Sequence, residues 1–344
     1  MGAACVLVMT TAACARPASD SPRAATADRP VGPVDVGANG KATRTGPCNA
    51  AVGGPPNGCP QPPPGGRPTI AGCSIFPADN AWNQDISNLS VHANSANYVA
   101  YINGTGGSMV HPDFGSNPSY GIPFSVVPDS QPPVPIMYDA YGSESDPGPF
   151  PIPLNAPVEA GSDRHVLVLQ SGTCQLYELG VGRAGASGWT ANVGVHWDLA
   201  SNALRTLGWT SADAAGLPIL PGLARYDEIA AGRIDHALRF TVNSTQRGYV
   251  LPATHFASSV TNTNAPPMGL RFRLRANFDR SGYTGASRVV LDALARYGMI
   301  VADNGSNWYI SGATDSRWDD DDLEQLKRVP GNAFEVVDTG PVRT

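Results

Sequence analysis

The sequence predicts a mainly β protein whose folded part is one domain of sandwich or jelly-roll type, with two or three peripheral helices. Three observations predict this class. Short alternating or apolar runs recur along the second half of the chain, turn residues separate them, and Gly (38) and Pro (32) are abundant among 344 residues. Hydrophobic residues make up 42% of the chain, enough for a sizeable core. Because all-β domains often run to about 200–250 residues, we expect one domain behind a tail.

The N-terminal residues have the composition of an export signal followed by a tether. An apolar run at 3–8 and small residues before Cys14 predict a signal or lipoprotein-like leader over 1–14, with Cys14 as a lipid-attachment site. Residues 15–72 are rich in Ala, Pro, Gly and polar residues without periodicity, which predicts a disordered tether. The globular domain is then expected over 73–344, in a protein that is secreted or held at the outer face of a membrane as a lipoprotein.

Four cysteines follow the leader, at positions 48, 59, 73 and 174. An even number in an exported chain predicts two disulfides, for which three connectivities exist. We favour Cys48–Cys59, which closes a Pro/Gly loop and leaves Cys73 to bond Cys174. A structural zinc site is the alternative, but no Cys-x-x-Cys pair is present.

The strand signals begin with a hairpin. Residues 164–170 and 174–179 are apolar or alternating and are separated by three turn residues. Residues 236–242 and 270–276 alternate between apolar and polar side chains and predict two further strands. Two more apolar runs flank Asn304-Gly305, a dipeptide typical of tight turns, and predict a second hairpin.

Helices are expected at few places. Apolar residues with helical spacing predict helices over 287–298 and 319–331. The second helix opens with four aspartates, which a helix N-terminus attracts; a calcium site is the alternative explanation. Asp227 is expected to cap a single helical turn that Gly232 ends. Residues 76–163 show little periodicity and predict long loops over a sheet.

Charge and motifs exclude several classes of function. The formal net charge of −6 and the lack of a basic run argue against nucleic-acid binding. The chain has no Gly-x-Ser-x-Gly elbow, Walker loop, dinucleotide-binding fingerprint or His-Glu-x-x-His pair. We therefore expect no cofactor and no catalytic metal, and we expect a monomer whose partner is a polysaccharide or a cell-wall glycan.

Residues 174–199 hold the first candidate for catalysis. If both ends of this segment are antiparallel strands, Glu178 could face His196 or Asp198. Two carboxylates are the machinery of glycoside hydrolysis, and one of them needs a raised pKa to act as the acid. The alternative is that these are ordinary polar residues on a solvated face. We take Glu178, Asp198 and His196 as candidate catalytic residues.

Residues 270–276 hold the second candidate. Arg271, Arg273 and Arg275 share one face of the predicted strand, about 6.8 Å apart along it. Such a row could bind the carboxylates of a polyuronate, and a lyase would add a base such as His255. The alternative is a solvated face paired with acidic neighbours.

Tryptophans beside turns and polar residues form the third signal. Aromatic rings next to Asn, Asp and Arg are typical of sugar sites, where rings stack on the apolar faces of sugars. We take Trp82, Trp197 and Trp308 as candidate substrate-binding residues, while other tryptophans are expected in the core.

Three stretches resemble a widespread group of exported bacterial proteins whose activity is uncharacterised. They are residues 216–240, 266–276 and 297–318, and the likeness covers roughly Cys73 to Asp338. The resemblance implies one exported domain and no particular activity. Together these observations predict an extracellular carbohydrate-active enzyme, in first place a glycoside hydrolase using Glu178 and Asp198, with a polyuronate lyase as a variant. The alternative is a non-catalytic glycan-binding or cell-envelope module.

Overall fold

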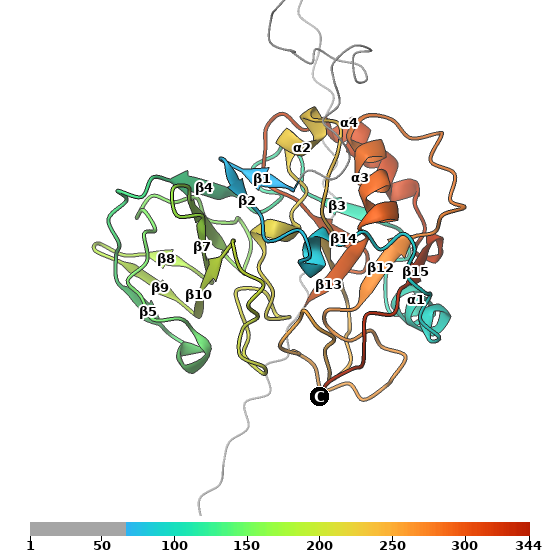
Figure 1. The fold of residues 1–344 in the computed structure, drawn as a ribbon, viewed down its shortest axis with the longest axis horizontal. Helices are drawn as coiled ribbons and strands as arrows, with labels where there is room; N and C mark the ends of the chain where they lie inside the picture. Colours follow the sequence, from blue (N-terminus) through green and yellow to red (C-terminus); the bar gives the residue numbers. More distant parts are fainter. Residues whose placement is uncertain (1–66) are drawn as a thin grey trace, which may run out of the picture. The chain divides into compact units, whose positions relative to one another are not determined.

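The computed structural model describes residues 67–344, and most of its regular structure is strand (Figure 1). The mainly β class is therefore confirmed. The strands are β1 (Thr69–Ile70), β2 (Cys73–Ser74), β3 (His111–Asp113), β4 (Phe124–Val127), β5 (Ile136–Tyr138), β6 (Val166–Gln170), β7 (Gln175–Gly180), β8 (Arg183–Ala184), β9 (Trp189–Ala191), β10 (Val193–Asp198), β11 (Leu238–Val242), β12 (Arg271–Leu274), β13 (Met299–Asn304), β14 (Tyr309–Ser311) and β15 (Phe334–Val336).

Helices are fewer and mostly short. The α-helices are α1 (Ser95–Gly104), α2 (Tyr226–Ala230), α3 (Gly285–Arg296) and α4 (Asp320–Leu323). The 3₁₀ helices are η1 (Ala81–Asn83), η2 (Gly142–Glu144), η3 (Leu220–Gly222), η4 (Glu324–Arg328) and η5 (Gly331–Ala333). Within residues 67–344, no helix combines the length and the apolar character needed to cross a bilayer.

A six-stranded sheet organises the larger core. Its order is β15-β12-β13-β11-β14-β3, and α3 packs against it on the right of Figure 1. Phe240, Phe272 and Phe334 from three of its strands surround Trp308, with ring centroids 5.5 to 5.8 Å from that indole. All four side chains are fully buried, so aromatic packing holds the middle of this sheet.

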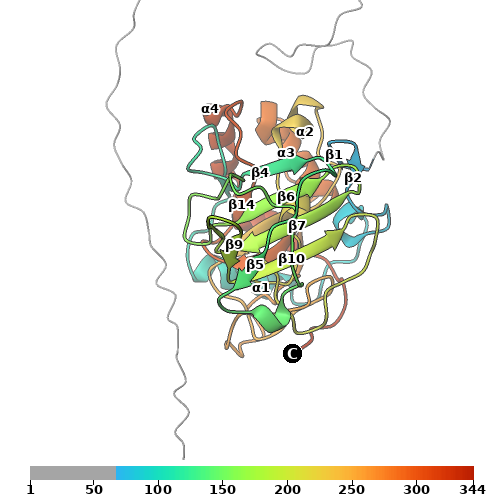
Figure 2. The ribbon, with the colours of Figure 1, turned by 90° about the vertical axis from the view of Figure 1, so that its left-hand side faces the viewer.

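A four-stranded sheet with the order β10-β7-β6-β4 lies beside the six-stranded sheet (Figures 1 and 2). One of its faces joins the larger core through Leu167 and Leu169, and the other packs in a smaller cluster with Val166 and Val168. The three-stranded sheet β5-β9-β8 supplies Trp189 to the smaller cluster. Burial on both faces explains why the first four residues of β6 are all apolar rather than alternating.

The finer prediction of a sandwich or jelly roll is not confirmed. Four strand pairs are parallel, namely β4–β6, β5–β9, β11–β13 and β3–β14, whereas a jelly roll is antiparallel. The predicted hairpin of 164–170 and 174–179 is confirmed as β6–β7, with Val166 opposite Leu179. The predicted strands at 236–242 and 270–276 are β11 and β12.

The hairpin predicted around Asn304-Gly305 is wrong. β13 and β14 flank β11 instead of pairing with each other, β13 parallel to it and β14 antiparallel. The connection crosses the end of β11, where Gly305 N donates to Val242 O and Trp308 N donates to Thr241 O. β11 therefore lies between the two strands that the turn residues predicted to be direct partners.

The helix predicted at 287–298 is confirmed as α3, and the start of the one at 319–331 is confirmed as α4 followed by η4. The aspartates that open α4 act on backbone donors: Asp319 accepts from the N–H groups of Asp321 and Asp322, and Asp320 accepts from Ser116 N at 2.8 Å.

The region 76–163, predicted as loops, differs from that expectation. It contains α1 and three strands, because partners distant in sequence bury segments that have no clear periodicity.

The turn near Asp227 forms as α2 and ends before Gly232, whose φ is +77°. Its cap is not Asp227, however. Arg225 occupies the cap position and Glu228 accepts from Arg225 N, while Asp227 pairs with Arg317.

The disulfide between Cys73 and Cys174 is confirmed, with Cα atoms 5.4 Å apart. It fastens β2 to the start of β7. The predictions of the leader, Cys14, the Cys48–Cys59 bond and most of the tether lie outside the described residues. Strand β1 pairs with β2, so regular structure starts before the predicted boundary at Cys73.

Candidate functional site

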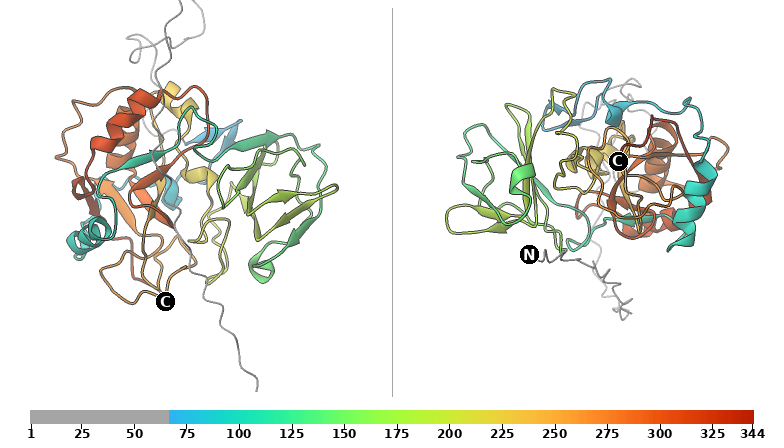
Figure 3. Two further views of the ribbon diagram at one scale, coloured as in Figure 1. Left: turned by 180° about the vertical axis from the view of Figure 1, so that it is seen from behind. Right: turned by 90° about the horizontal axis from the view of Figure 1, so that it is seen from below.

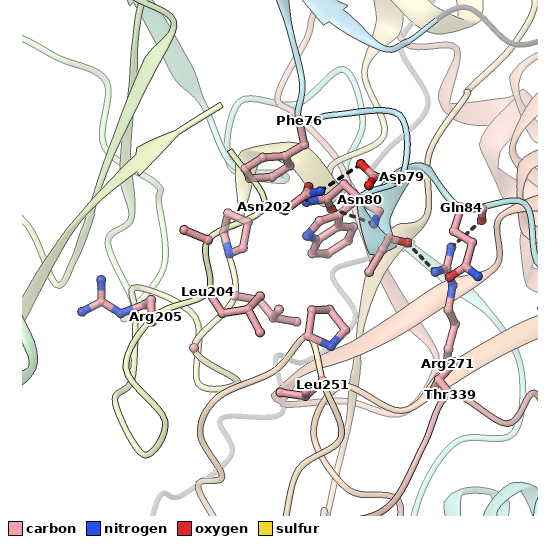
Figure 4. A pocket seen from close by; sticks show the side chains of 18 of the residues that line it. Phe76, Asp79, Asn80, Gln84, Asn202, Leu204, Arg205, Leu251, Arg271 and Thr339 are labelled. Carbon is pink, nitrogen blue, oxygen red and sulfur yellow. Dashed lines mark hydrogen bonds between the residues drawn. The ribbon is translucent and has the colours of Figure 1, made fainter. Parts of the chain in front are cut away.

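A cavity of about 540 Å³ opens between the larger sheet and the loops that lead to and from the four-stranded sheet (Figure 4). Its apolar lining includes Phe76, Leu204 and Leu251, and its polar lining includes Asn80 and Asn202. We call it the first hollow. Apolar walls with a few placed amide groups are typical of small-molecule and sugar sites.

The amide groups at one edge of the first hollow are held by hydrogen bonds to each other. Asn80 Nδ2 donates to Asn202 Oδ1 at 2.8 Å, and Asn202 Nδ2 donates to Asp79 Oδ1 at 2.9 Å (Figure 4). Asn80 Oδ1 also accepts from Trp82 N, which caps η1. These contacts tie the loop after β10 to the segment after β2, so this edge is ordered before any ligand binds.

A second hollow of about 300 Å³ adjoins the first. Asp146, His196, Asp198 and Trp209 line it, and its lining shares Trp197 and the residues 203–205 with the first hollow. The loop at 203–205 therefore separates two neighbouring depressions. A chain molecule that lay in both would cross this loop.

Arg205 fixes the loop between the two hollows. Its guanidinium donates to Thr210 O at 2.8 Å and to Asp146 Oδ2 at 3.0 Å. The same group lies 5.8 Å from the ring of Trp197 and 5.7 Å from the ring of Trp209. Cation–π contacts and a carboxylate partner together hold this arginine between two aromatic rings.

Glu178 is completely buried beneath this region. Its carboxylate accepts hydrogen bonds from Ile219 N at 2.9 Å, Leu220 N at 2.9 Å and Trp197 Nε1 at 3.0 Å. Burial raises the pKa of Glu178 to about 7, although these three donors oppose the rise. The carboxylate joins β7 to the start of η3 and to the indole of Trp197, which is a structural role.

The expected approach of Glu178 to Asp198 or His196 is wrong. β7 and β10 are antiparallel neighbours as predicted, but Glu178 is opposite Val195, whereas His196 is opposite Tyr177 and Asp198 opposite Gln175. Because side chains alternate along strands, Glu178 points into the larger core and the other two lie on the opposite face. The structure does not bring the two carboxylates together.

His196 and Asp198 lie in the second hollow. The His196 ring stacks on Tyr177 at 4.9 Å, and its Nε2 contacts the Gln175 amide oxygen. Burial lowers the pKa of His196 below its usual value. Asp198 is exposed and accepts from Gln175 Nε2 and Ala200 N.

The arginine row exists, but its charges are already engaged. Arg271 is buried and donates to the carbonyl oxygens of Tyr297, Ala81 and Gln84, and burial lowers its pKa to about 9. Arg273 binds the Glu335 carboxylate at 2.8 Å.

The remaining guanidinium contacts complete this pattern. Arg273 also donates to the carbonyl oxygens of Ile86, Ser87 and Leu89, and Arg275 donates to Asn332 O and Glu335. Of the three arginines, Arg271 lines the first hollow, and its donors point at backbone carbonyls (Figure 4). The row therefore offers no free guanidinium to a polyuronate, and its expected substrate-binding role is not supported.

The tryptophans divide between site and core. Trp82 and Trp197 line the first hollow, each with less than a tenth of its surface exposed. Trp308 is fully buried among the aromatic side chains of the six-stranded sheet, so its predicted place in a groove is wrong. His255 is partly exposed and lines neither hollow.

Sequence reasoning missed Asp146, Arg205 and the role of Trp209. Asp146 lies in a loop without periodicity, and the carboxylate partner of Arg205 lies 59 positions away in the sequence, so neither residue carried a signal that the sequence alone reveals. Trp209, in a turn-rich segment beside Gly208, carried the same signal as the other loop tryptophans.

No protein-family model, curated protein or solved structure matches the chain. Among residues 67–344, no three His, Cys, Asp or Glu side chains gather in a way that could hold a metal ion. The disulfide between Cys73 and Cys174 is typical of an oxidising compartment.

Proposed function

We propose that this domain works outside the cytoplasm as a glycan-binding module, with a polysaccharide chain lying across the two hollows. The observation that carries the proposal is that two adjoining depressions share one aromatic and arginine-bearing rim, formed by Trp197 and the loop at 203–205. A row of subsites suits a polymer of repeating units better than a single small molecule.

The chemistry of the lining supports a sugar ligand. Trp209 and Leu204 offer apolar surface for the CH faces of sugar rings, and Asn80, Asn202 and Asp198 offer groups for hydroxyls. We place the protein in the secreted or lipid-anchored class, with Cys14 as the proposed point of attachment. Hydrolysis by Glu178 with Asp198 is not part of the proposal, because these carboxylates lie on opposite sheet faces.

The test is a substitution in the second hollow, at Trp209. Trp209 is only partly buried, so Trp209→Ala is expected to leave the fold intact and to weaken polysaccharide binding by about 10-fold or more, since a central aromatic contact is lost. Binding is measured by affinity electrophoresis against a panel of neutral and uronic-acid polysaccharides.

Tyr120→Ala is the matched control, because Tyr120 is an exposed aromatic residue (46%) that lines neither hollow. The control is expected to bind like the wild type. A wild-type protein that binds nothing in the panel, or equal losses in the two variants, would rule out glycan binding at this site.

A further inference from the structure

The two hollows are lined by more acidic than basic side chains. The segment that follows β10 lies between the four-stranded and the six-stranded sheet, and it contributes to both linings (Figure 3). Each hollow has two aspartates in its lining, whereas the two linings together have two arginines. These charged residues are Asp79 and Asp338 in the first hollow, Asp146 and Asp198 in the second, and Arg205 and Arg271. Negative charge is therefore in excess along the whole site.

Both arginines direct their donors at acceptors inside the protein. Arg205 donates to Asp146 Oδ2 at 3.0 Å and to Thr210 O at 2.8 Å, and in Figure 4 its side chain points away from the other labelled residues. Arg271 is 2% exposed, and its donors point at backbone carbonyl oxygens. Neither guanidinium is therefore placed to bind an anionic ligand in the hollows, and one of the four aspartates, Asp146, is neutralised by Arg205.

The other three aspartates are exposed, and within residues 67–344 none of them forms an ion pair. Asp79 Oδ1 accepts from a side-chain amide at 2.9 Å, as Figure 4 shows, and Asp338 Oδ1 accepts from a backbone N–H at 3.1 Å. Asp198 Oδ1 accepts from one donor of each kind. In all three, the second oxygen, Oδ2, accepts no hydrogen bond from any described residue. We call these atoms the open oxygens.

His196 is the one histidine in the linings, and it does not compensate Asp198. Its Nε2 contacts the amide oxygen of Gln175, and its ring stacks on Tyr177. Burial lowers the pKa of His196 below its usual value, so the ring favours its neutral form. The three exposed aspartates are thus negative charges on the wall of a cavity, each with one oxygen available to a ligand.

The open oxygens distinguish between classes of sugar. A uronic-acid or sulfated sugar would bring its own negative charge toward three carboxylates, which repel it. A hydroxyl group can donate to an open oxygen, but it adds no charge. An ammonium group donates and also neutralises the carboxylate, and such charge-assisted hydrogen bonds are roughly twice as strong as neutral ones. The lining therefore favours a sugar that carries a free amino group.

We propose that the glycan bound across the two hollows is a polymer of amino sugars with free amino groups, whose ammonium groups bind the open oxygens of Asp79, Asp198 and Asp338. This inference rests on the proposed function, since it names the class of glycan for the same site. The open oxygens lie in both hollows, so the ligand carries ammonium groups at more than one position. A repeating amino-sugar unit meets this requirement and keeps the apolar ring faces that Trp209 and Leu204 contact.

The first test compares two ligands with the same backbone. The β-1,4-linked hexamer of glucosamine carries amino groups, and N-acetylation of the same hexamer removes their charge. Isothermal titration calorimetry at pH 6 is expected to give the glucosamine hexamer a Kd lower by about 10-fold or more. This preference is expected to shrink when NaCl is raised from 50 to 500 mM, because salt screens exposed charges. Equal affinities, or tighter binding of the acetylated hexamer, would overturn the proposal.

The variants Asp79→Asn, Asp198→Asn and Asp338→Asn test the carboxylates, and Asp279→Asn is the matched control. Asp279 is exposed, lines neither hollow and, like Asp338, accepts through Oδ1 from the backbone N–H two residues later. Each variant at the hollows is expected to weaken binding of the glucosamine hexamer about 3-fold, and the triple variant to remove the preference between the two hexamers. A preference that survives in the triple variant, or that Asp279→Asn also removes, contradicts the assignment.

A hexalysine peptide tests whether charge alone is recognised. It has an amino group on each unit but no sugar rings, so it is expected to bind about 10-fold or more weakly than the glucosamine hexamer. Equal or tighter binding of hexalysine would make a basic peptide the better ligand, against the proposal. Polysaccharide binding that Trp209→Ala weakens, without any preference for the glucosamine hexamer, would refute this inference and leave the proposed function intact. The two proposals therefore fail in different experiments.

Discussion

At the scale of single residues, Glu178 shows how a polar side chain at a core position is stabilised. Its two oxygens satisfy the N–H groups of Ile219 and Leu220 and the indole of Trp197 inside the protein. A buried carboxylate is costly, and this cost is offset only because each oxygen has donors. Glu178 therefore connects β7, η3 and the wall of the first hollow.

Glu178→Ala is expected to reduce the free energy of unfolding by about 3 kcal/mol or more, because three buried donors lose their acceptor. Glu178→Gln keeps one oxygen for Ile219 and Leu220 and loses the bond to Trp197, so its cost is expected to be smaller. Urea unfolding at pH 5.5 measures both. Equal costs for Gln and Ala would mean that the hydrogen bonds contribute little to stability.

At the scale of elements, the disulfide fixes β2 against the start of β7, residues 101 positions apart. The double variant Cys73→Ala/Cys174→Ala is expected to be less stable by about 4 kcal/mol, since a long loop is freed in the unfolded chain. Thermal unfolding with and without dithiothreitol measures the loss.

The control uses the same reductant on the variant. Dithiothreitol is expected to lower the melting temperature of the wild type strongly and that of the double variant little. An equal shift in both proteins would show that the stabilisation comes from cysteines other than Cys73 and Cys174.

The strand pairing around β11 explains one failed prediction at the same scale. Asn304-Gly305 has the local chemistry of a tight turn, but β11 lies between β13 and β14. Local residues determine how sharply a chain turns. Which strand then pairs with β14 depends on the tertiary packing, here on the burial of Phe240 against Trp308. The arginine row failed for a related reason, because its partners, among them carbonyl oxygens of residues about 190 positions away, are distant in the sequence.

At the scale of the whole molecule, the pH dependence of stability follows from a few buried groups. Glu178 and Asp303 have pKa values raised to about 7, and His165 has one raised to about 9. All three bind protons more tightly when folded than when unfolded. Stability rises with pH only where the unfolded chain binds more protons, so their contributions are lost as the pH rises through these values.

At low pH, stability depends on the buried carboxylates whose pKa values are lowered. Glu159 and Glu228 have their pKa values lowered by His165 and Arg225, and they lose their contribution only below about pH 4.5. We expect the free energy of unfolding to be greatest near pH 5 to 6 and to fall by a few kcal/mol by pH 9. Urea titrations at pH 5.5, 7 and 9 measure it. A stability that increases toward pH 9 would contradict this assignment of buried charges.

The sequence by itself determined the elements that depend on neighbours in the chain. The mainly β class, the β6–β7 hairpin, α3 and the capping aspartates before α4 follow from alternation, helical spacing and turn chemistry, which act over a few residues. The Cys73–Cys174 bond was also within reach, because so few pairings of four cysteines exist.

Tertiary structure alone decided which side chains meet. Glu178 and Asp198 lie on opposite faces because Glu178 pairs with Val195, which lies three positions, an odd number, before Asp198 on β10. Trp308 belongs to the core, and Asp79 meets Asn202 although the two lie 123 positions apart. These outcomes depend on strand order, register and long-range partners, which are set by the burial of apolar surface across the whole domain and leave no mark in any short stretch of sequence.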